Sequence, residues 1–374
     1  MPRLLLLLIV ALLPAAADAC TTIAFTNPER PILAYNFDFP IGQAVVLVNK
    51  AGLDKTSETQ GRPARWRARY ASITFNMFGR DSPMTGMNEA GLATSQMWLD
   101  EARYEAPDAR PTIGVAEWMQ YVLDTSATVE EALANIAKVR IESRIPLHYK
   151  LMDAGGNAAV VEFLDGKAQI RSADGLPYAV LANDSYARSL DFLNQVKSGG
   201  AQAQGSGSLA RFTRAALAQQ SARDPAGDPV AMAFATLADV AQSGYTQWSI
   251  VYDVAKREVR WYTRGNAAIR SVSLAGFDAS CATPTLFIDI QEGADDVSSR
   301  FRPFASADNE RLILATFKAT PFLAHIEEAS IRQSARWPDQ SPCRGNEDRC
   351  AARWKCDIAR VIMVATHQFT GRGT

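Results

Sequence analysis

The sequence lacks an excess of charge of either sign, since 39 lysine and arginine residues balance 40 aspartate and glutamate residues. A formal net charge of −1 excludes a general electrostatic attraction to nucleic acid or to an anionic membrane. No apolar run reaches the roughly 18 residues that a membrane span requires, so we expect no transmembrane segment. With 47% hydrophobic and 21% charged residues, the chain is not a disordered protein and has the length for one or two globular domains.

Histidine is scarce, and the usual nucleotide motifs are missing. The three histidines, His148, His325 and His367, lie far apart, and no Cys-x-x-Cys spacing occurs, which argues against a metal site. The segment Gly86–Gly91 has two glycines, but it has neither the Lys-Ser/Thr of a P-loop nor the third glycine of a dinucleotide-binding turn. We therefore expect neither a cofactor nor a metal ion.

The N-terminus has the pattern of a secretory signal peptide. Arg3 precedes the apolar run Leu4–Leu13, and a small-residue Ala-Asp-Ala triplet ends directly before Cys20. The sequence thus predicts residues 1–19 as a signal peptide. Such a signal would direct the protein to the periplasm or out of the cell. Cleavage after residue 19 would make Cys20 the first residue of the mature chain.

Position alone leaves three interpretations of Cys20 open. The first interpretation is a structural cysteine. The second is the acylated anchor of a lipoprotein, although Ala17 and Asp18 fit the usual lipoprotein pattern badly. The third interpretation is an N-terminal nucleophile. Its α-amino group, with a pKa of about 7.7 to 8, would then be the general base for its own thiol, with a pKa of about 8.5. In that case catalysis needs no separate histidine.

The other four cysteines are Cys281, Cys343, Cys350 and Cys356. Because an oxidising compartment favours disulfides, we expect two bridges among these four, in any of three pairings, and a free Cys20. A zinc site is the alternative for the four, but their spacing lacks the usual short pair.

Strands and helices are expected in blocks rather than in strict alternation. Strands are expected at residues 21–25, 32–39, 44–49, 72–78, 149–152, 158–163 and 178–182, with a hairpin at 247–262. Helices are expected between residues 114 and 141, where Thr128 and Glu131 form a capping box, and at 187–196, 209–220 and 230–241. These blocks indicate an α+β fold of antiparallel sheets packed with helix layers. We interpret residues 20–374 as one domain, with a disulfide-bearing C-terminal extension from about residue 285.

The first two strands would form a hairpin that brings a carboxylate to Cys20. A three-residue loop, Pro28–Arg30, would place Cys20 opposite Asp38 and on the same face of the hairpin. In this register Asn36 and Asp38 share the polar face of the second strand, and Tyr35 lies on the apolar face. A carboxylate beside the chain terminus can hold the amino group in position while a proton moves.

These residues carry a resemblance to a known family. The quoted segments, in order, are Cys20-Thr21-Thr22-Ile23, Asn36-Phe37-Asp38, Gly86-Met87-Asn88-Glu89-Ala90-Gly91-Leu92, Leu181-Ala182-Asn183, Leu209-Ala210-Arg211-Phe212 and Tyr245 through Asp253. Their order resembles the choloylglycine hydrolase and penicillin V acylase family, from Cys20 to about Asn266. The resemblance implies an N-terminal nucleophile hydrolase with a four-layer αββα sandwich, which cleaves a linear C–N amide bond through a thioester on the cysteine.

The resemblance also implies a role for each catalytic residue. Cys20 would be the nucleophile and the base, and Asp38 would orient its amine and thiol. Asn183 would donate a hydrogen bond to the oxyanion, and Arg211 would be the cation near the thiol, where a guanidinium lowers the thiol pKa.

Two positions depart from the family pattern. Tyr35 stands where the family usually has an arginine, so one charge in the site is missing. Trp98 stands where the family usually has asparagine or tyrosine, and its side chain makes a larger apolar wall. We expect Tyr35, Trp98 and Met87 to contact the substrate.

The resulting hypothesis is an exported amidase that acts on an N-acylated small molecule. N-acyl homoserine lactones, penicillin V and conjugated bile salts are the substrates that the resemblance implies, and the missing arginine favours an uncharged N-acyl amide. The alternative is a lipid-anchored or soluble binding protein that keeps the fold without catalysis. We expect no nucleic-acid partner, and the sequence leaves a homo-oligomer open.

Overall fold

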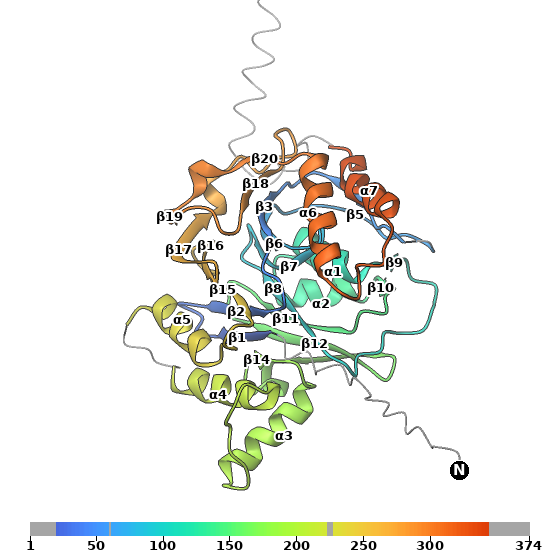
Figure 1. The fold of residues 1–374 in the computed structure, drawn as a ribbon. Helices are drawn as coiled ribbons and strands as arrows, with labels where there is room; N and C mark the ends of the chain where they lie inside the picture. Colours follow the sequence, from blue (N-terminus) through green and yellow to red (C-terminus); the bar gives the residue numbers. More distant parts are fainter. Residues whose placement is uncertain (1–19, 60, 223–226, 344–374) are drawn as a thin grey trace, which may run out of the picture.

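A computed structural model describes residues 20–59, 61–222 and 227–343 of the chain (Figure 1). The predicted signal peptide, residues 1–19, and two of the distal cysteines, Cys350 and Cys356, lie outside these ranges. Within the ranges no helix is both long and apolar enough to cross a membrane.

The first of two large sheets has seven strands, in the order β14-β1-β2-β15-β16-β17-β19. They are β1 (Thr21–Phe25), β2 (Ile32–Asp38), β14 (Val180–Leu181), β15 (Thr246–Asp253), β16 (Glu258–Thr263), β17 (Asn266–Ser273) and β19 (Asp295–Asp296). The helices on its outer side are α3 (Tyr186–Lys197), α4 (Ser208–Ser221) and α5 (Pro229–Asp239). Helices α4 and α5 pack on the sheet itself, and α3 packs on α4.

The second sheet has nine strands, in the order β13-β12-β11-β8-β7-β6-β3-β18-β20. They are β3 (Val45–Asn49), β6 (Ser72–Asn76), β7 (Pro83–Asn88), β8 (Ala93–Trp98), β11 (Leu147–Met152), β12 (Ala158–Leu164), β13 (Lys167–Ser172), β18 (Leu286–Asp289) and β20 (Arg302–Pro303). Its outer side carries α1 (Val115–Thr125) and α2 (Val129–Ile136), and two small sheets pair β4 (Asp54–Thr56) with β5 (Arg65–Arg67) and β9 (Thr112–Ile113) with β10 (Arg140–Ile141).

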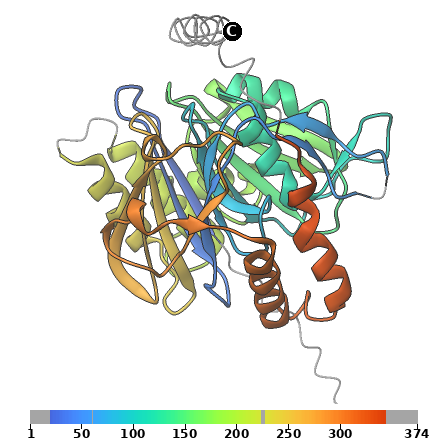
Figure 2. The same ribbon diagram turned by 90° about the horizontal axis from the view of Figure 1, so that it is seen from above.

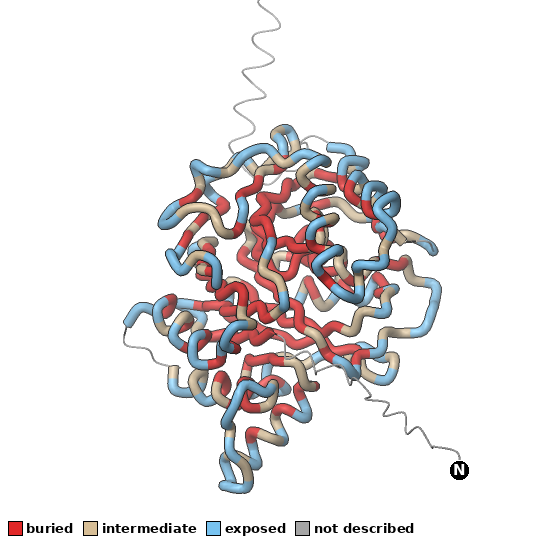
Figure 3. The backbone as a smooth tube through the Cα atoms, in the orientation of Figure 1, coloured by how far each residue is buried: buried red, intermediate tan, exposed pale blue. Residues whose placement is uncertain are grey.

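The two large sheets face each other, so the molecule has four layers, helices, sheet, sheet and helices (Figure 2). Trp248, Trp261 and Phe75 are fully buried between the sheets, and Trp118 and Tyr149 pack between the second sheet and its helices. Because both faces of the central strands are covered, these strands are buried along almost their whole length and appear as a continuous buried centre in Figure 3. This is the αββα sandwich that the resemblance implied, and the prediction of an α+β fold is confirmed.

The C-terminal extension adds a pair of helices, α6 (Ser306–Ala319) and α7 (Glu328–Arg336), beside the turn between β6 and β7. In that turn Gly79 has a φ of +106°, and a Cβ there would lie 2.7 Å from the Cδ1 atom of Ile313, so glycine lets α6 approach closely. The next residue, Arg80, donates its backbone N–H to Asn309 of α6 at 2.8 Å. The extension is therefore packed against the sandwich.

A disulfide joins Cys281 to Cys343, so both helices lie within the loop of chain that the bridge closes. It is one of the three pairings that the sequence left open. Cys20 is free, as predicted, and it is buried. The second expected bridge involves Cys350 and Cys356, which lie outside the described residues, so it stays a prediction.

Candidate active site

The hairpin that carries Cys20 has a register one residue away from the predicted one. Thr21 pairs with Asn36, because the turn between the strands has two central residues instead of three. A shift of one residue turns every side chain to the opposite face of a sheet. Cys20 therefore lies on the apolar face with Tyr35, and not opposite Asp38 on the polar face.

The thiol of Cys20 is buried between the sheets, at the start of β1. The hydroxyl of Tyr35 donates to its Sγ atom, with an Oη–Sγ distance of 3.2 Å. Burial, and to a smaller extent the nearby carboxylate of Asp38, raise the pKa of the thiol to about 12. The Tyr35 hydroxyl, the backbone N–H of Asp38 and the Arg211 guanidinium act in the opposite direction. The thiol is thus protonated at neutral pH and needs a base.

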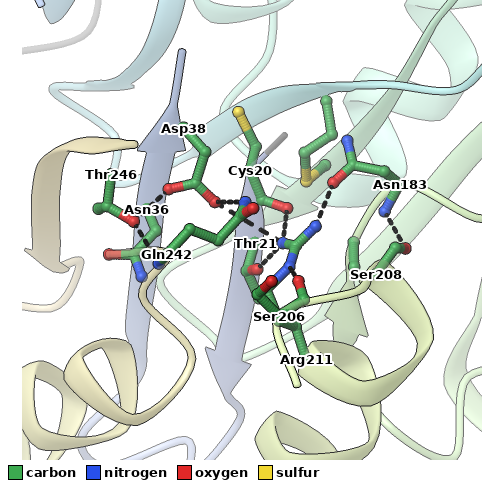
Figure 4. Close-up of polar contacts among 12 residues, drawn as sticks. Cys20, Thr21, Asn36, Asp38, Asn183, Ser206, Ser208, Arg211, Gln242 and Thr246 are labelled. Atoms are coloured by element: carbon green, nitrogen blue, oxygen red, sulfur yellow. Dashed lines mark hydrogen bonds and ion pairs between the residues drawn. The ribbon is translucent and has the colours of Figure 1, made fainter. Parts of the chain in front are cut away.

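Arg211, in the first turn of α4, connects the predicted catalytic residues (Figure 4). Its side chain is fully buried, and it donates to the carbonyl oxygen of Cys20 at 2.7 Å and to Oδ1 of Asn183 at 2.9 Å. The carboxylate of Asp38 is 3.7 Å from its Nη1 atom. The structure therefore brings together the four residues that the sequence assigned to catalysis.

Two residues that the sequence analysis missed hold the carboxylate of Asp38. Gln242 donates from Nε2 to Oδ2 at 2.7 Å, and the hydroxyl of Thr246 donates to Oδ1 (Figure 4). A β-bulge in β15 follows Thr246, where the pairing of β15 with β2 is irregular. Bulges often lie next to active sites because they redirect a side chain. The only sequence signal was their position just before and within the segment Tyr245–Asp253.

Asn183 follows β14 and is held on three sides. Its Oδ1 accepts from Arg211, and its backbone N–H donates to Ser208 at 2.9 Å (Figure 4). Its Nδ2 atom donates to the carbonyl oxygen of Trp98 at 2.9 Å. An amide nitrogen carries two hydrogens, so Nδ2 can donate a second hydrogen bond. The side chain is a fixed donor of the kind that stabilises a developing negative charge.

Tyr35 and Trp98 lie at the site, and Met87 does not. Trp98 ends β8 with a half-buried side chain, and its carbonyl contacts Asn183. Met87 pairs with Ala93 at the other end of β8, five residues or about 17 Å along the strand from Trp98. Sequence proximity suggested a contact that the antiparallel pairing of β7 with β8 does not allow.

The described residues place neither a metal-binding cluster nor the cavity of about 990 Å³ at this site. In the described ranges no group of three His, Cys, Asp or Glu side chains is placed to hold a metal ion. A cavity of about 990 Å³ lies beside the β1–β2 turn, at the far end of β1 from Cys20, and is lined by Phe25, Asp153 and Leu176 among others. This cavity therefore does not include the surroundings of Cys20.

Comparison with known proteins finds a matching family and similar proteins. The family model described as linear amide C–N hydrolases, choloylglycine hydrolase family, matches residues 20–287. A penicillin V acylase from Pectobacterium atrosepticum is 31% identical over 192 residues, which are 45% of this chain and 50% of that protein, so the match spans only half the length of this curated relative.

Two solved structures have a similar fold. One is a penicillin V acylase from Agrobacterium tumefaciens, with a TM-score of 0.67 and 23% identity over 76% of this chain and 98% of the other. The second is a conjugated bile acid hydrolase from Clostridium perfringens, with a TM-score of 0.60 and 17% identity over 74% of this chain and 98% of the other.

Proposed function

Because this chain belongs to the choloylglycine hydrolase family of linear amide C–N hydrolases, we propose that it cleaves the amide bond of an N-acylated small molecule with Cys20 as nucleophile. The observation that carries this proposal is the buried arrangement in which Arg211 contacts Cys20, Asn183 and Asp38 together. A buried guanidinium with three such partners is costly unless they all stay in place, which favours a preorganised site.

The proposed first half-reaction forms a thioester and releases the amine. The α-amino group of Cys20, freed by cleavage after Ala19, takes the proton of the thiol while Sγ attacks the carbonyl carbon of the substrate. The α-ammonium group then gives this proton to the nitrogen of the leaving group, and the C–N bond breaks. A free α-ammonium also brings a positive charge close to Sγ, which lowers the thiol pKa from the value of the uncleaved chain.

The second half-reaction hydrolyses the thioester. The α-amino group takes a proton from water, whose oxygen attacks the thioester carbonyl, and the departing sulfur recovers a proton as the carboxylic acid leaves. In both halves the carbonyl oxygen becomes negative, and Nδ2 of Asn183 is the proposed donor to it. One such donor contributes on the order of 3 kcal/mol to the rate.

Asp38 and Arg211 have positioning and electrostatic roles in this proposal. Asp38 is fixed by Gln242 and Thr246, so its carboxylate is a rigid acceptor near the start of β1. Arg211 holds the carbonyl group of Cys20 and offsets the negative charge of Asp38, which would otherwise oppose formation of the thiolate.

The substrate proposed is an N-acyl amide with an apolar acyl group. Trp98 offers a half-buried apolar surface next to Asn183. Tyr35 contributes a neutral hydroxyl where the family usually has a cation, so recognition of an obligatory carboxylate lacks one charge. We place N-acyl homoserine lactones ahead of penicillin V and conjugated bile salts for this reason. We also propose export, because the Ala-Asp-Ala triplet ends directly before Cys20.

The test of this function combines a mass measurement on the mature chain with the activities of two variants. Intact-mass analysis of the mature chain should show Cys20 at the N-terminus without a diacylglyceryl group, whereas the lipid mass would support the anchored binding protein. Cys20→Ser should lose amide hydrolysis by on the order of 10³-fold or more, because the terminal amine activates a hydroxyl poorly.

An added methionine before Cys20 should abolish activity equally, since it turns the base into a neutral amide. Thermal unfolding of both variants controls for folding. Wild-type turnover by either variant would exclude the mechanism.

A further inference from the structure

The family match ends at residue 287, but the described chain continues to residue 343 and carries an unusual exposed ring. Phe322, just after α6, has a side chain that is 46% exposed. The other exposed large hydrophobic residues within the described ranges are Ile170, Leu217 and Ile269. Phe322 differs from these three because its ring contacts that of Trp98, beside the candidate active site.

A first line of aromatic contacts connects Phe322 with the proposed oxyanion donor. The ring of Phe322 lies 6.0 Å from that of Trp98, centroid to centroid, in a tilted arrangement. The carbonyl group of Trp98 accepts from Nδ2 of Asn183. Only Trp98 therefore separates Phe322 from Asn183, the proposed oxyanion donor.

A second series of aromatic contacts runs from the same extension to the side of the site where Asp38 lies. Phe39 directly follows Asp38, and its ring is 6.1 Å from that of Phe78, in the turn between β6 and β7. Phe78 in turn lies edge-on to Phe317 of α6, at 5.9 Å. Phe39, Phe78 and Phe317 are all half-buried. Rings of the extension thus meet rings beside both Asp38 and Asn183.

We propose that the extension forms one wall of the acyl-binding site, and that Phe322 and Phe317 contact the acyl group of the substrate. This inference rests on the proposed function, since it assigns the acyl group to the surface next to Trp98. The wall consists of the uncharged rings of Phe39, Phe78, Trp98, Phe317 and Phe322. An uncharged surface suits an aliphatic or aromatic acyl group better than a polar leaving group. An acyl chain on Phe322 would remove its exposed face from water.

The extension is held firmly enough for this role. Asn309 of α6 accepts from Arg80 and donates to the carbonyl group of Ala335, so one side chain ties α6 to both the sandwich and α7. The disulfide Cys281–Cys343 ties the far end of the extension to the segment before β18. A wall fixed at both ends can discriminate between acyl groups by fit.

The test compares acyl-chain preference in three variants of the mature protein. The probes are N-acyl homoserine lactones with short, medium and long straight acyl chains, which share one leaving group. Phe322→Ala removes the ring, Phe322→Leu keeps part of the apolar surface, and Ile269→Ala removes an equally exposed apolar side chain from β17. Since Phe322 is half exposed, its removal leaves no internal cavity, and the variants should unfold at nearly the wild-type temperature.

A buried methylene group improves binding by about fourfold, so loss of the ring should matter only where the chain reaches it. Phe322→Ala should lower kcat/KM for the long chains by roughly tenfold and for the shortest chain by less than about twofold. Phe322→Leu should fall between, and Ile269→Ala should match wild type. An unchanged chain-length profile in an active Phe322→Ala enzyme would overturn the inference and leave the proposed function intact. No turnover of any acyl amide by the wild type, with no acyl group on Cys20, would instead overturn the proposed function.

Discussion

Replacing Tyr35 by phenylalanine removes the hydroxyl group that donates to the thiol of Cys20 and keeps the aromatic ring. This hydroxyl has two acceptors, Sγ of Cys20 at 3.2 Å and the carbonyl oxygen of Gln96 at 3.0 Å. Its single hydrogen can serve one of them fully. A carbonyl oxygen is the better acceptor while the thiol is neutral, and the thiolate becomes the better one as negative charge develops. We therefore expect the hydrogen bond to move towards sulfur along the reaction.

The magnitude follows from this exchange. A buried hydrogen bond to a charged group contributes about 1.5 to 3 kcal/mol, and the neutral bond that is given up contributes about 1 kcal/mol. The difference, about 0.5 to 2 kcal/mol, corresponds to a loss of roughly 2- to 30-fold in kcat/KM. The hydrogen bond from Tyr35 lowers the pKa of Cys20, so its removal raises that pKa. Any activity that depends on the thiolate should move to higher pH.

The assay is the rate of Cys20 alkylation and of amide hydrolysis between about pH 6 and pH 10. Tyr35→Phe should slow both reactions by similar factors, with KM nearly unchanged. Tyr252→Phe is the matched control, because Tyr252 is equally buried and donates to Thr85 at 3.1 Å instead of to the thiol. Equal losses in the two variants, or an unaltered alkylation rate in Tyr35→Phe, would refute the reasoning.

Three further outcomes are expected. Trp98→Ala should change the acyl-chain preference on a panel of acyl homoserine lactones, penicillin V and glycocholate, and best wild-type turnover on glycocholate would contradict the assignment of an uncharged substrate. Cys281→Ser should destabilise the protein by about 4 kcal/mol, from a sequence separation of 62 residues, as measured by denaturant unfolding against the intact protein; a loss below about 1 kcal/mol would argue against the bridge. Non-reducing peptide mapping should find Cys281 joined to Cys343, Cys350 joined to Cys356, and Cys20 free, whereas a bridged Cys20 would contradict the catalytic assignment as well.

Periodicity located most of the sandwich, because strands buried on both faces and amphipathic helices leave strong local patterns. The helix at Val129–Ile136 begins as predicted, with the Thr128 hydroxyl accepting from the backbone of Glu131 at 3.1 Å. The hairpin register was less accessible, since it depends on whether the turn has two or three central residues. The two lengths differ little in sequence, but they place Cys20 on opposite faces of the sheet.

Contacts between distant segments were the hardest to predict. Gln242 and Thr246 are ordinary polar residues until the pairing of β2 with β15 brings them to Asp38. The motif around Asn88, which carried part of the resemblance, proves to be structural, because the amide of Asn88 ties the β7–β8 turn to the end of α1. Met87 was assigned to the site through its neighbours in sequence, and the strand direction takes it away from there.

The place of β2 between β1 and β15 also sets an order of events during folding. Asp38 and Thr246, which contact each other in the native protein, are 208 residues apart in sequence. Contacts of such long range are slow to form, and a chain emerging from the ribosome cannot form this one until most of it has been synthesised. Strand β2, which carries Asp38, therefore waits for the second half of the protein with one neighbour missing. A substitution that weakens β15 should then slow the appearance of activity more than the collapse of the chain.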